Sequence, residues 1–409
     1  MEVITHVSHN RCNYEHSVPL HVDWPNGHST RSYAKRVTWI DGHNVGAQCY
    51  SPDCEYVARE KRMIPDPTLL GLLFRKTKTE PCDLPYSVVI PMHNKRNDIQ
   101  RTLASVFNQT RMPNRVIVID DNSSDESAKI VEGLNYKLML IRLEKNIGKA
   151  GAINEALKCV NDPFVLILDA DTVLANDYAE LVMQGFVKEV VGVSGRVLSA
   201  SNNTTCQKSR VVEYLFGQRM LKSFQARIGG MWVLMGCATM WNNKWLKDSG
   251  GMPSNTVVED LELSWRAQQN HKVNYIHNAV CFTEDPTSLS NYISQIYRWY
   301  SWRPAFGFVD FMKLRRGLKA VIAWSIVDTF VAVAVTVFLA YSLLIGRFDY
   351  VGTTVFIDWM ILASFTGYEG FKVGKFWDAI EGLPCYMALR YANILVLLVA
   401  LIKPKKRWY

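Results

Sequence analysis

The chain has 409 residues, of which 48% are apolar and 21% are charged, and its formal net charge is +8. A chain of this length exceeds the size at which one hydrophobic core usually stops growing, so we expect more than one structural unit. The basic excess lies next to apolar C-terminal stretches and lacks the aromatic interleaving of RNA-binding segments, which favours lipid headgroups and argues against nucleic acid.

Residues 1–82 hold six of the nine histidines and four of the nine cysteines. Cys12, His16, Cys49 and Cys54 could together hold zinc. The Cys49–Cys54 spacing is looser than in the usual structural pairs, however, so a small β-rich segment with incidental His and Cys is the favoured interpretation.

The rest of this extension gives weaker signals. Residues 68–76, TLLGLLFRK, predict an amphipathic helix that lies either on a membrane or on the neighbouring domain. The first residues lack a basic region followed by an apolar run, so we expect no signal peptide. The cysteines show no disulfide-framework spacing, which predicts reduced thiols and a cytosolic compartment.

A regular alternation of strands and helices begins at Tyr86. Short β-branched runs predict strands at 86–91, 115–121, 137–144 and 164–171, and helical patterns lie between them at 97–109 and 148–160. Such alternation predicts an α/β fold with a mostly parallel, Rossmann-like sheet covered on both faces. Further strands are predicted at 190–197, 233–241 and 273–282.

Acidic residues follow two of these strands, at the sheet edge where α/β proteins bind ligands. Asp120 and Asp121 follow one strand and could accept from a base or a ribose, or could cap the next helix. Asp169 and Asp171 follow another strand. Two carboxylates so close together favour a hard divalent cation, Mg²⁺ or Mn²⁺, bridged to phosphate.

Two further stretches carry candidate site residues. NIGKAGAIN at 146–154 supplies a glycine turn, Lys149 and a helix start, which suit a phosphate, although a plain helix entry is the competing interpretation. In VVEDLELSWRAQQ, Glu259 and Asp260 begin a predicted helix. They are either dipole-favoured caps or, in a closed cleft, a general base that takes a proton from an acceptor hydroxyl.

Apolar stretches at 320–346, 350–366 and 383–402 are candidates for membrane spans. Each carries one ionisable residue (Asp328, Asp358 and Arg390), and we expect Asp–Arg pairing inside the bundle rather than a transport role. Basic clusters on both sides of these stretches favour two true spans, with the middle or last stretch re-entrant or interfacial.

Taken together, the motifs identify a family resemblance that covers about residues 85–320. In order they read YSVVIPMHNKRND, VIDDNSSD, NIGKAGAIN, LDADT, SGRVL, MGCATMW, VVEDLELSWRA, TEDPTSL and QIYRW. The set resembles the inverting family-2 glycosyltransferases, and within them the membrane-embedded processive synthases of hyaluronan, chitin, cellulose and poly-N-acetylglucosamine.

The resemblance implies a role for each matching position. At the donor end, Asp121, with Asp120 beside it, would hold the uridine of a UDP-sugar and Lys149 would lie near the nucleotide. Asp169 and Asp171 would face the diphosphate, with Asp171 the stronger metal ligand.

At the acceptor end, Asp260, next to Glu259, would be the base. Gln295, Arg298 and Trp299 form the Q-x-x-R-W element, in which Arg298 would neutralise the leaving diphosphate and Trp299 would stack under the acceptor sugar. An aromatic belt at the membrane interface is the other interpretation of Trp299.

The expected protein is therefore a multi-pass membrane enzyme with a cytosolic catalytic domain that transfers sugar from a UDP-sugar to a growing polysaccharide, with possible coupled extrusion. A single-addition glycolipid synthase and a catalytically silent sugar-binding scaffold are the alternatives. The sequence does not specify the oligomeric state. The expected divisions are an extension at 1–82, a catalytic domain at 83–287, interfacial amphipathic helices at 288–319, transmembrane or re-entrant helices at 320–402, and a basic tail at 403–409.

Overall fold

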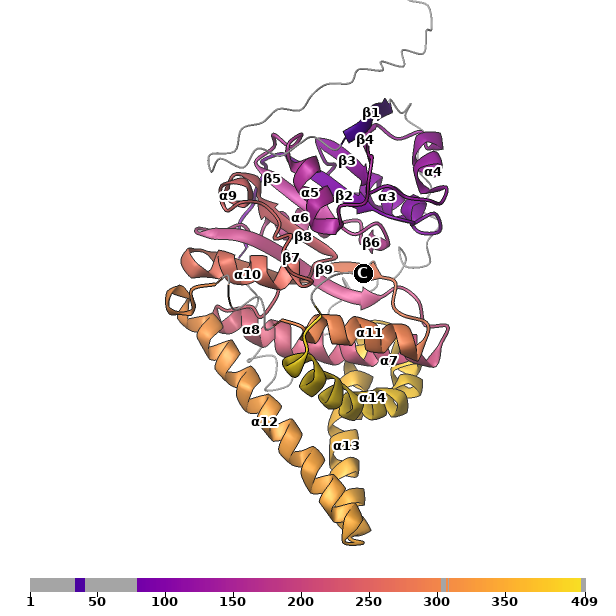
Figure 1. Ribbon diagram of the computed structural model, residues 1–409, viewed down its shortest axis with the longest axis vertical. Coiled ribbons are helices and arrows are strands. Elements are labelled where there is room, and N and C mark those ends of the chain that lie inside the picture. Colours follow the sequence, from indigo (N-terminus) through magenta and orange to yellow (C-terminus); the bar gives the residue numbers. More distant parts are fainter. Residues whose placement is uncertain (1–33, 41–78, 303–306, 308, 406–409) are drawn as a thin grey trace, which may run out of the picture.

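The computed structural model of the protein describes residues 34–40, 79–302, 307 and 309–405 (Figure 1). The proposed zinc ligands Cys12, His16, Cys49 and Cys54 and the predicted helix at 68–76 lie outside these residues. In the described part, the strands form one nine-stranded sheet in the order β1-β4-β3-β2-β5-β8-β7-β9-β6.

The first half of the sheet confirms the predicted parallel arrangement. Its parallel strands are β2 (Tyr86–Met92), β3 (Arg115–Asp120), β4 (Leu138–Leu143) and β5 (Phe164–Leu168). Their β-branched runs suit a sheet that is buried on both faces. One additional strand, β1 (Ala34–Ile40), pairs antiparallel with the β4 edge.

The second half of the sheet is mixed. Its strands are β6 (Thr172–Leu174), β7 (Val190–Ser199), β8 (Ala238–Asn242) and β9 (Lys272–Thr283). The strand predicted at 233–241 begins only at Ala238. Preceding backbone amides donate instead to side chains of the helix opposite, as Leu234 does to Ser264 Oγ at 2.9 Å.

Helices cover both faces, because successive side chains of a strand point to opposite sides. Val88 and Ile90 belong to one core and Val89 to the other, and each core is closed by helices. These helices are α3 (Ile99–Phe107), α4 (Ser127–Gly133), α5 (Lys149–Leu157), α6 (Tyr178–Met183), α9 (Asn243–Asp248) and α10 (Glu259–Asn270).

Below the sheet lies a layer of helices that the sequence only partly predicts (Figure 1). One continuous helical run comprises α7 (Thr205–Phe216), the π-helical turn η1 (Gly217–Lys222) and α8 (Ser223–Ile228). It begins with a capping box between Thr204 and Gln207. Beside it lies α11 (Leu289–Tyr300), which carries the Q-x-x-R-W element.

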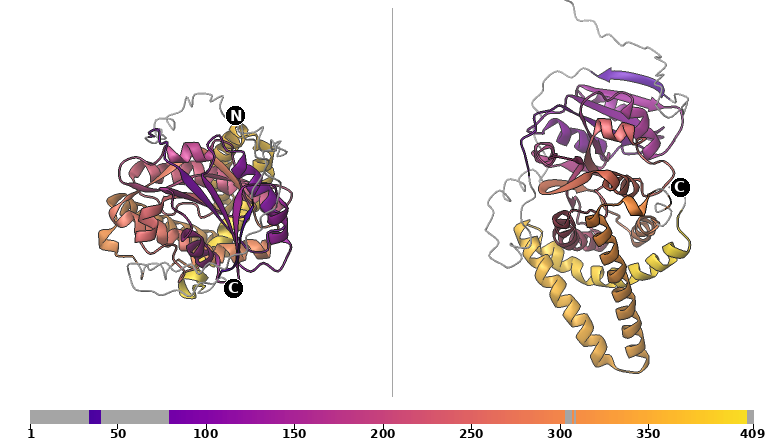
Figure 2. Two further views of the ribbon diagram at one scale, coloured as in Figure 1. Left: turned by 90° about the horizontal axis from the view of Figure 1, so that it is seen from above. Right: turned by 90° about the vertical axis from the view of Figure 1, so that its left-hand side faces the viewer.

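Three long helices complete the chain: α12 (Arg316–Leu344), α13 (Phe348–Lys372) and α14 (Phe376–Ile402). A single-turn helix, η3 (Phe311–Lys313), precedes them. Helices α12 and α13 project from the domain as a hairpin, whereas α14 runs across beneath it (Figures 1 and 2).

Close backbone contact fixes the crossing of α14 over α7. A Cβ on Gly382 would lie 2.2 Å from the Lys208 carbonyl oxygen, so only glycine fits there. Two residues later, Pro384 lies inside α14, where it removes a backbone donor. The predicted Asp–Arg pairing is confirmed for Arg390 of α14 and Asp358 of α13, whose Nη1 and Oδ1 are 2.5 Å apart.

Among the described residues, α12 and α14 are long and apolar enough to cross a membrane. The hairpin that projects from the domain, however, pairs α12 with α13 (Figure 2). Length and composition therefore select α12 and α14, whereas the packing separates α12 and α13 from the domain that contains the sheet.

Candidate active site

A cavity of about 1990 Å³ begins at the carboxyl ends of β2, β3 and β5 and continues between α12, α13 and α14. Its upper wall includes Asp121, Lys149, Asp169 and Asp171, which were predicted from three separate motifs. Further along, its walls include Glu259, Asp260, Gln295, Arg298 and Trp299. The structure therefore brings both halves of the predicted site to one continuous space.

Asp120 and Asp121 have different surroundings. Asp121 lines the cavity and accepts a hydrogen bond from the Ile147 N–H at 2.7 Å, where Gly148, with φ of 80°, turns the chain into α5. Burial raises the pKa of Asp121 above its usual value. Asp120 instead pairs with Arg142 at 3.4 Å and accepts from the Ser123 N–H. It is absent from the described residues that line the cavity.

Lys149 connects two acidic groups from distant parts of the chain. Its Nζ lies 2.5 Å from Asp169 Oδ1 and 3.7 Å from Glu259 Oε1, and it also donates to the Gly236 carbonyl. Burial lowers the pKa of Lys149, but Asp169 and Glu259 more than compensate and raise it above its usual value. A cation therefore remains at the first turn of α5, where backbone amides also favour an anionic ligand.

Asp171 faces Lys95, with which it forms an ion pair. Both aspartates of the D-x-D motif thus lie in the cavity wall beside a cation. Among the described residues, no group of three or more His, Cys, Asp or Glu side chains is placed to hold a metal ion. Two carboxylates fit Mg²⁺ or Mn²⁺ as a partial site, since such ions complete their coordination with water and substrate phosphate oxygens.

Glu259 and Asp260 begin α10 in contrasting environments. Glu259 is 3% exposed, and its Oε2 has no hydrogen-bond partner in the described part of the chain. Burial raises the pKa of Glu259 to about 7, although Lys149 opposes the shift. Asp260 lines the cavity, and a Cβ on Gly236 would lie 2.7 Å from its Oδ2. Any side chain at Gly236 would therefore displace the Asp260 carboxylate.

Helix α11 brings Gln295, Arg298 and Trp299 to the cavity. Arg298 donates to the Val257 carbonyl at 3.4 Å, just before the Glu259–Asp260 pair, and its charge lowers the pKa of Glu259 against the effect of burial. Gln295 Oε1 is buried and has no hydrogen-bond partner among the described residues. Arg298 therefore lies close to Glu259, which Lys149 also contacts.

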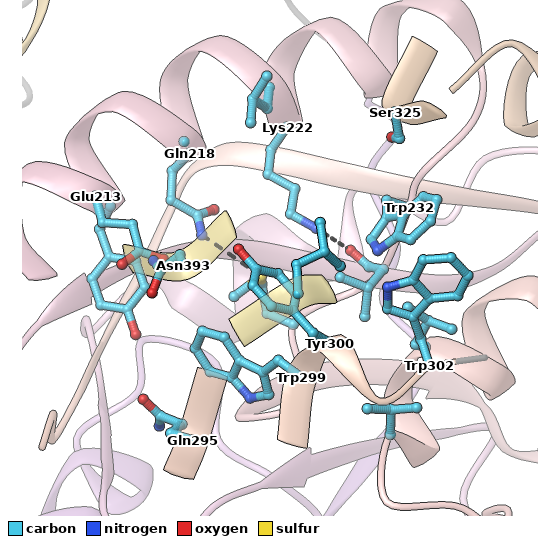
Figure 3. A pocket seen from close by; sticks show the side chains of 18 of the residues that line it. Glu213, Gln218, Lys222, Trp232, Gln295, Trp299, Tyr300, Trp302, Ser325 and Asn393 are labelled. Carbon is cyan, nitrogen blue, oxygen red and sulfur yellow. Dashed lines mark hydrogen bonds between the residues drawn. The ribbon is translucent and has the colours of Figure 1, made fainter. Parts of the chain in front are cut away.

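Sequence reasoning missed several residues of the cavity wall. Lys95 follows the first strand in HNKRND, and its contact with Asp171 spans 76 positions, which no local pattern reveals. Lys222, from η1, donates to the Val233 carbonyl, and burial lowers its pKa to about 8. Figure 3 shows its ammonium pointing into the pocket, with Trp232 and Trp302 at one side.

The comparisons with known proteins agree with this geometry. Residues 87–248 match the family model described as glycosyl transferase family 2. These residues are a family-2 glycosyltransferase domain. The match spans the sheet from β2 to β8 and includes Asp121, Lys149 and both aspartates of the D-x-D motif.

Two curated relatives are synthases of the same polysaccharide. A poly-β-1,6-N-acetyl-D-glucosamine synthase of Staphylococcus epidermidis is 28% identical over 218 residues, which are 52% of this chain and 53% of the relative. One from Staphylococcus aureus is 25% identical over 216 residues, 52% of each chain. The chain thus spans about half the length of the curated relatives it matches.

A solved mannosyltransferase from Pyrobaculum calidifontis, in complex with GDP-Man and Mn²⁺, has the same fold. It superposes with a TM-score of 0.56 at 17% identity, over 86% of this chain and 93% of the other. The superposition extends beyond the glycosyltransferase domain, since it includes most of the present chain.

Proposed function

We propose that the protein transfers a sugar from a UDP-sugar, with inversion, to a hydroxyl of a growing N-acetylglucosamine polysaccharide at a membrane surface. The observation that carries the proposal is the single cavity shared by Asp169, Asp171, Asp260, Arg298 and Trp299. The glycosyltransferase domain and the description of the curated relatives support the polymer as product.

The upper part of the cavity serves the donor. Asp121, rather than the Arg142-paired Asp120, accepts from the uridine, and Lys149 at the start of α5 lies next to the diphosphate. Asp169 and Asp171 are the residues that would hold Mg²⁺ or Mn²⁺ together with the donor. When bound, the ion supplies positive charge to the diphosphate oxygens.

The lower part carries out the displacement at the anomeric carbon. Asp260 takes the proton from the acceptor hydroxyl as that oxygen attacks the side opposite the diphosphate, which inverts the configuration. Arg298 neutralises charge on the leaving diphosphate. Trp299 offers a flat apolar ring to the acceptor sugar. Gln295, whose Oε1 has no hydrogen-bond partner among the described residues, accepts from a sugar hydroxyl.

Glu259 has a different task from its neighbour Asp260. It is buried, it touches Lys149 and its pKa is raised to about 7. A partly protonated carboxyl leaves more of the Lys149 charge available to the donor phosphates than a fully ionised one. The protonation state of Glu259 therefore determines how much of the Lys149 charge acts on the phosphates of the nucleotide.

The packing of the last three helices supports a membrane arrangement as part of this proposal. The α12–α13 hairpin projects from the rest of the protein and α14 runs beneath α7 (Figure 2). We infer that the hairpin enters the bilayer, that α14 lies at the interface and that the catalytic domain faces the cytosol. The cavity continues from the site into the space beside α12, which offers a direction for the lengthening chain and for coupled extrusion.

The extension of the cavity between the long helices also favours one alternative function, a single addition of sugar to a lipid acceptor. The deep end of the cavity is lined by apolar side chains of α12 and α14, such as Phe330, Val333 and Leu397. The two functions differ in their product. Membranes containing the protein should convert labelled UDP-N-acetylglucosamine into a ladder or a high-mass polymer. A single lipid-extractable product would establish the alternative, and Asp260→Asn membranes serve as the matched control.

A further inference from the structure

Arg210 of α7 is fully buried below the cavity wall, among charged and aromatic side chains. It is 0% exposed, and its Nε lies 3.2 Å from Asp285 Oδ1 while its Nη1 lies 2.6 Å from Glu213 Oε2. Its Nη2 also donates to the Tyr214 hydroxyl at 3.0 Å. A guanidinium with this many partners is held in one orientation, because its donors form a rigid planar fork.

The same guanidinium lies over aromatic rings. Its Cζ is 4.7 Å from the centroid of the Trp299 indole and 4.8 Å from that of Tyr214. Both distances are within the range of a cation–π interaction, which is stronger when the groups are shielded from water. Arg210 therefore restrains the indole of the Q-x-x-R-W element.

Glu213 and Trp299 line the cavity, whereas Arg210 does not. Figure 3 shows Glu213, Asn393 and Trp299 gathered at one side of the pocket. One carboxylate oxygen of Glu213 is bound to Arg210, so the other can accept hydroxyl donors from a ligand. A flat ring beside a carboxylate suits a pyranose, which presents an apolar face and a rim of hydroxyls.

We propose that Trp299 and Glu213 form an acceptor-sugar subsite, and that Arg210, anchored by Asp285, is the positioning residue that contacts both groups and fixes their orientation. The inference rests on the proposed function, since it names residues that hold the acceptor of that reaction. It adds Glu213 as a hydrogen-bonding partner for the sugar and explains the buried Asp285 of TEDPT.

Equilibrium binding tests the subsite without depending on turnover. The probe is a β-1,6-linked N-acetylglucosamine pentasaccharide, titrated calorimetrically into detergent-solubilised protein that is saturated with UDP and Mn²⁺. Glu213→Gln removes the charge of the acceptor group, and Arg210→Met removes the contacts that orient Glu213 and Trp299. Each should weaken binding about tenfold, which is near the lower end of the effect of a hydrogen bond to a charged group. Arg210→Lys should recover part of the loss, and UDP affinity should stay unchanged.

Arg196 of β7 provides the matched control. It is also 0% exposed and paired with a buried carboxylate, Glu369 at 3.4 Å, but it does not line the cavity. Arg196→Met should lower the melting temperature without selectively weakening the pentasaccharide. If Arg210→Met behaves like Arg196→Met, or if Glu213→Gln binds the pentasaccharide normally, the inference is wrong.

The two proposals fail separately. Wild-type protein that binds no pentasaccharide, but still forms polymer from the UDP-sugar, overturns the subsite alone. Protein that binds the pentasaccharide through Arg210 and Glu213, but transfers no sugar, keeps the subsite and overturns the proposed reaction.

Discussion

Replacing Glu259 by glutamine should stabilise the protein above neutral pH. The carboxylate is 3% exposed, Oε1 is 3.7 Å from Lys149 Nζ, and Oε2 lacks a hydrogen-bond partner among the described residues. Burial of this kind penalises the ionised form more than one lysine at that distance compensates. Glutamine keeps the shape of the side chain and removes the charge, and Lys149 retains Asp169 at 2.5 Å.

The magnitude follows from the pKa. Folding raises the pKa of Glu259 from 4.5 to about 7. Since each pKa unit corresponds to about 1.4 kcal/mol, the ionised folded protein loses about 3 kcal/mol relative to the protonated one. In the window between pH 4.5 and about pH 7, the Glu259 carboxyl has released its proton in the unfolded chain but still holds it in the folded chain. Stability contributed by the protonated group therefore falls as pH rises through the window and levels off above the folded pKa.

The assay is chemical unfolding of the solubilised wild type and Glu259→Gln, compared between about pH 5 and about pH 8. The difference in unfolding free energy between the two should grow with pH and reach about 3 kcal/mol, with glutamine the more stable at the alkaline end. An identical pH profile for both proteins would show that Glu259 ionises normally, and the reasoning about its burial would be refuted.

Three further predictions concern the reaction. Asp260→Asn should lower transfer about a hundred- to ten-thousandfold while UDP affinity stays the same, measured by product counting and by titration; undiminished transfer would remove Asp260 from the mechanism. EDTA should stop activity and Mg²⁺ or Mn²⁺ should restore it, with Asp171→Asn needing a higher metal concentration for half-maximal rate; a rate indifferent to EDTA would contradict the metal assignment. Arg298→Ala should lower kcat about a hundred- to a thousandfold, and an unchanged kcat would mean that Arg298 does not touch the leaving group.

The residue patterns within single segments were enough to predict the parallel strands and the residues at their carboxyl ends. The β-branched runs predicted β2 to β5 within a few residues, and the acidic residues at the ends of β3 and β5 lie at the sheet edge as expected. Lys149 at the start of α5 also lies in the predicted position. These features follow from side-chain periodicity and from the rule that ligands bind at the carboxyl ends of parallel strands.

Other features depend on contacts between distant segments and could not be predicted. Glu259 and Asp260 are adjacent at one helix start, and only the packed structure shows which is buried. The ion pair of Arg210 with Asp285 joins positions 75 apart. The placement of α14 beneath α7 depends on the close approach at Gly382, which hydropathy does not record.

The most direct test of the account is an experimental structure of the membrane-embedded protein with UDP and Mn²⁺. We expect the ion between Asp171 and the diphosphate, and the Arg298 guanidinium within hydrogen-bonding reach of that diphosphate. If the nucleotide is bound elsewhere, or if Arg298 points away from the cavity that Asp169 and Asp171 line, the proposed site is wrong.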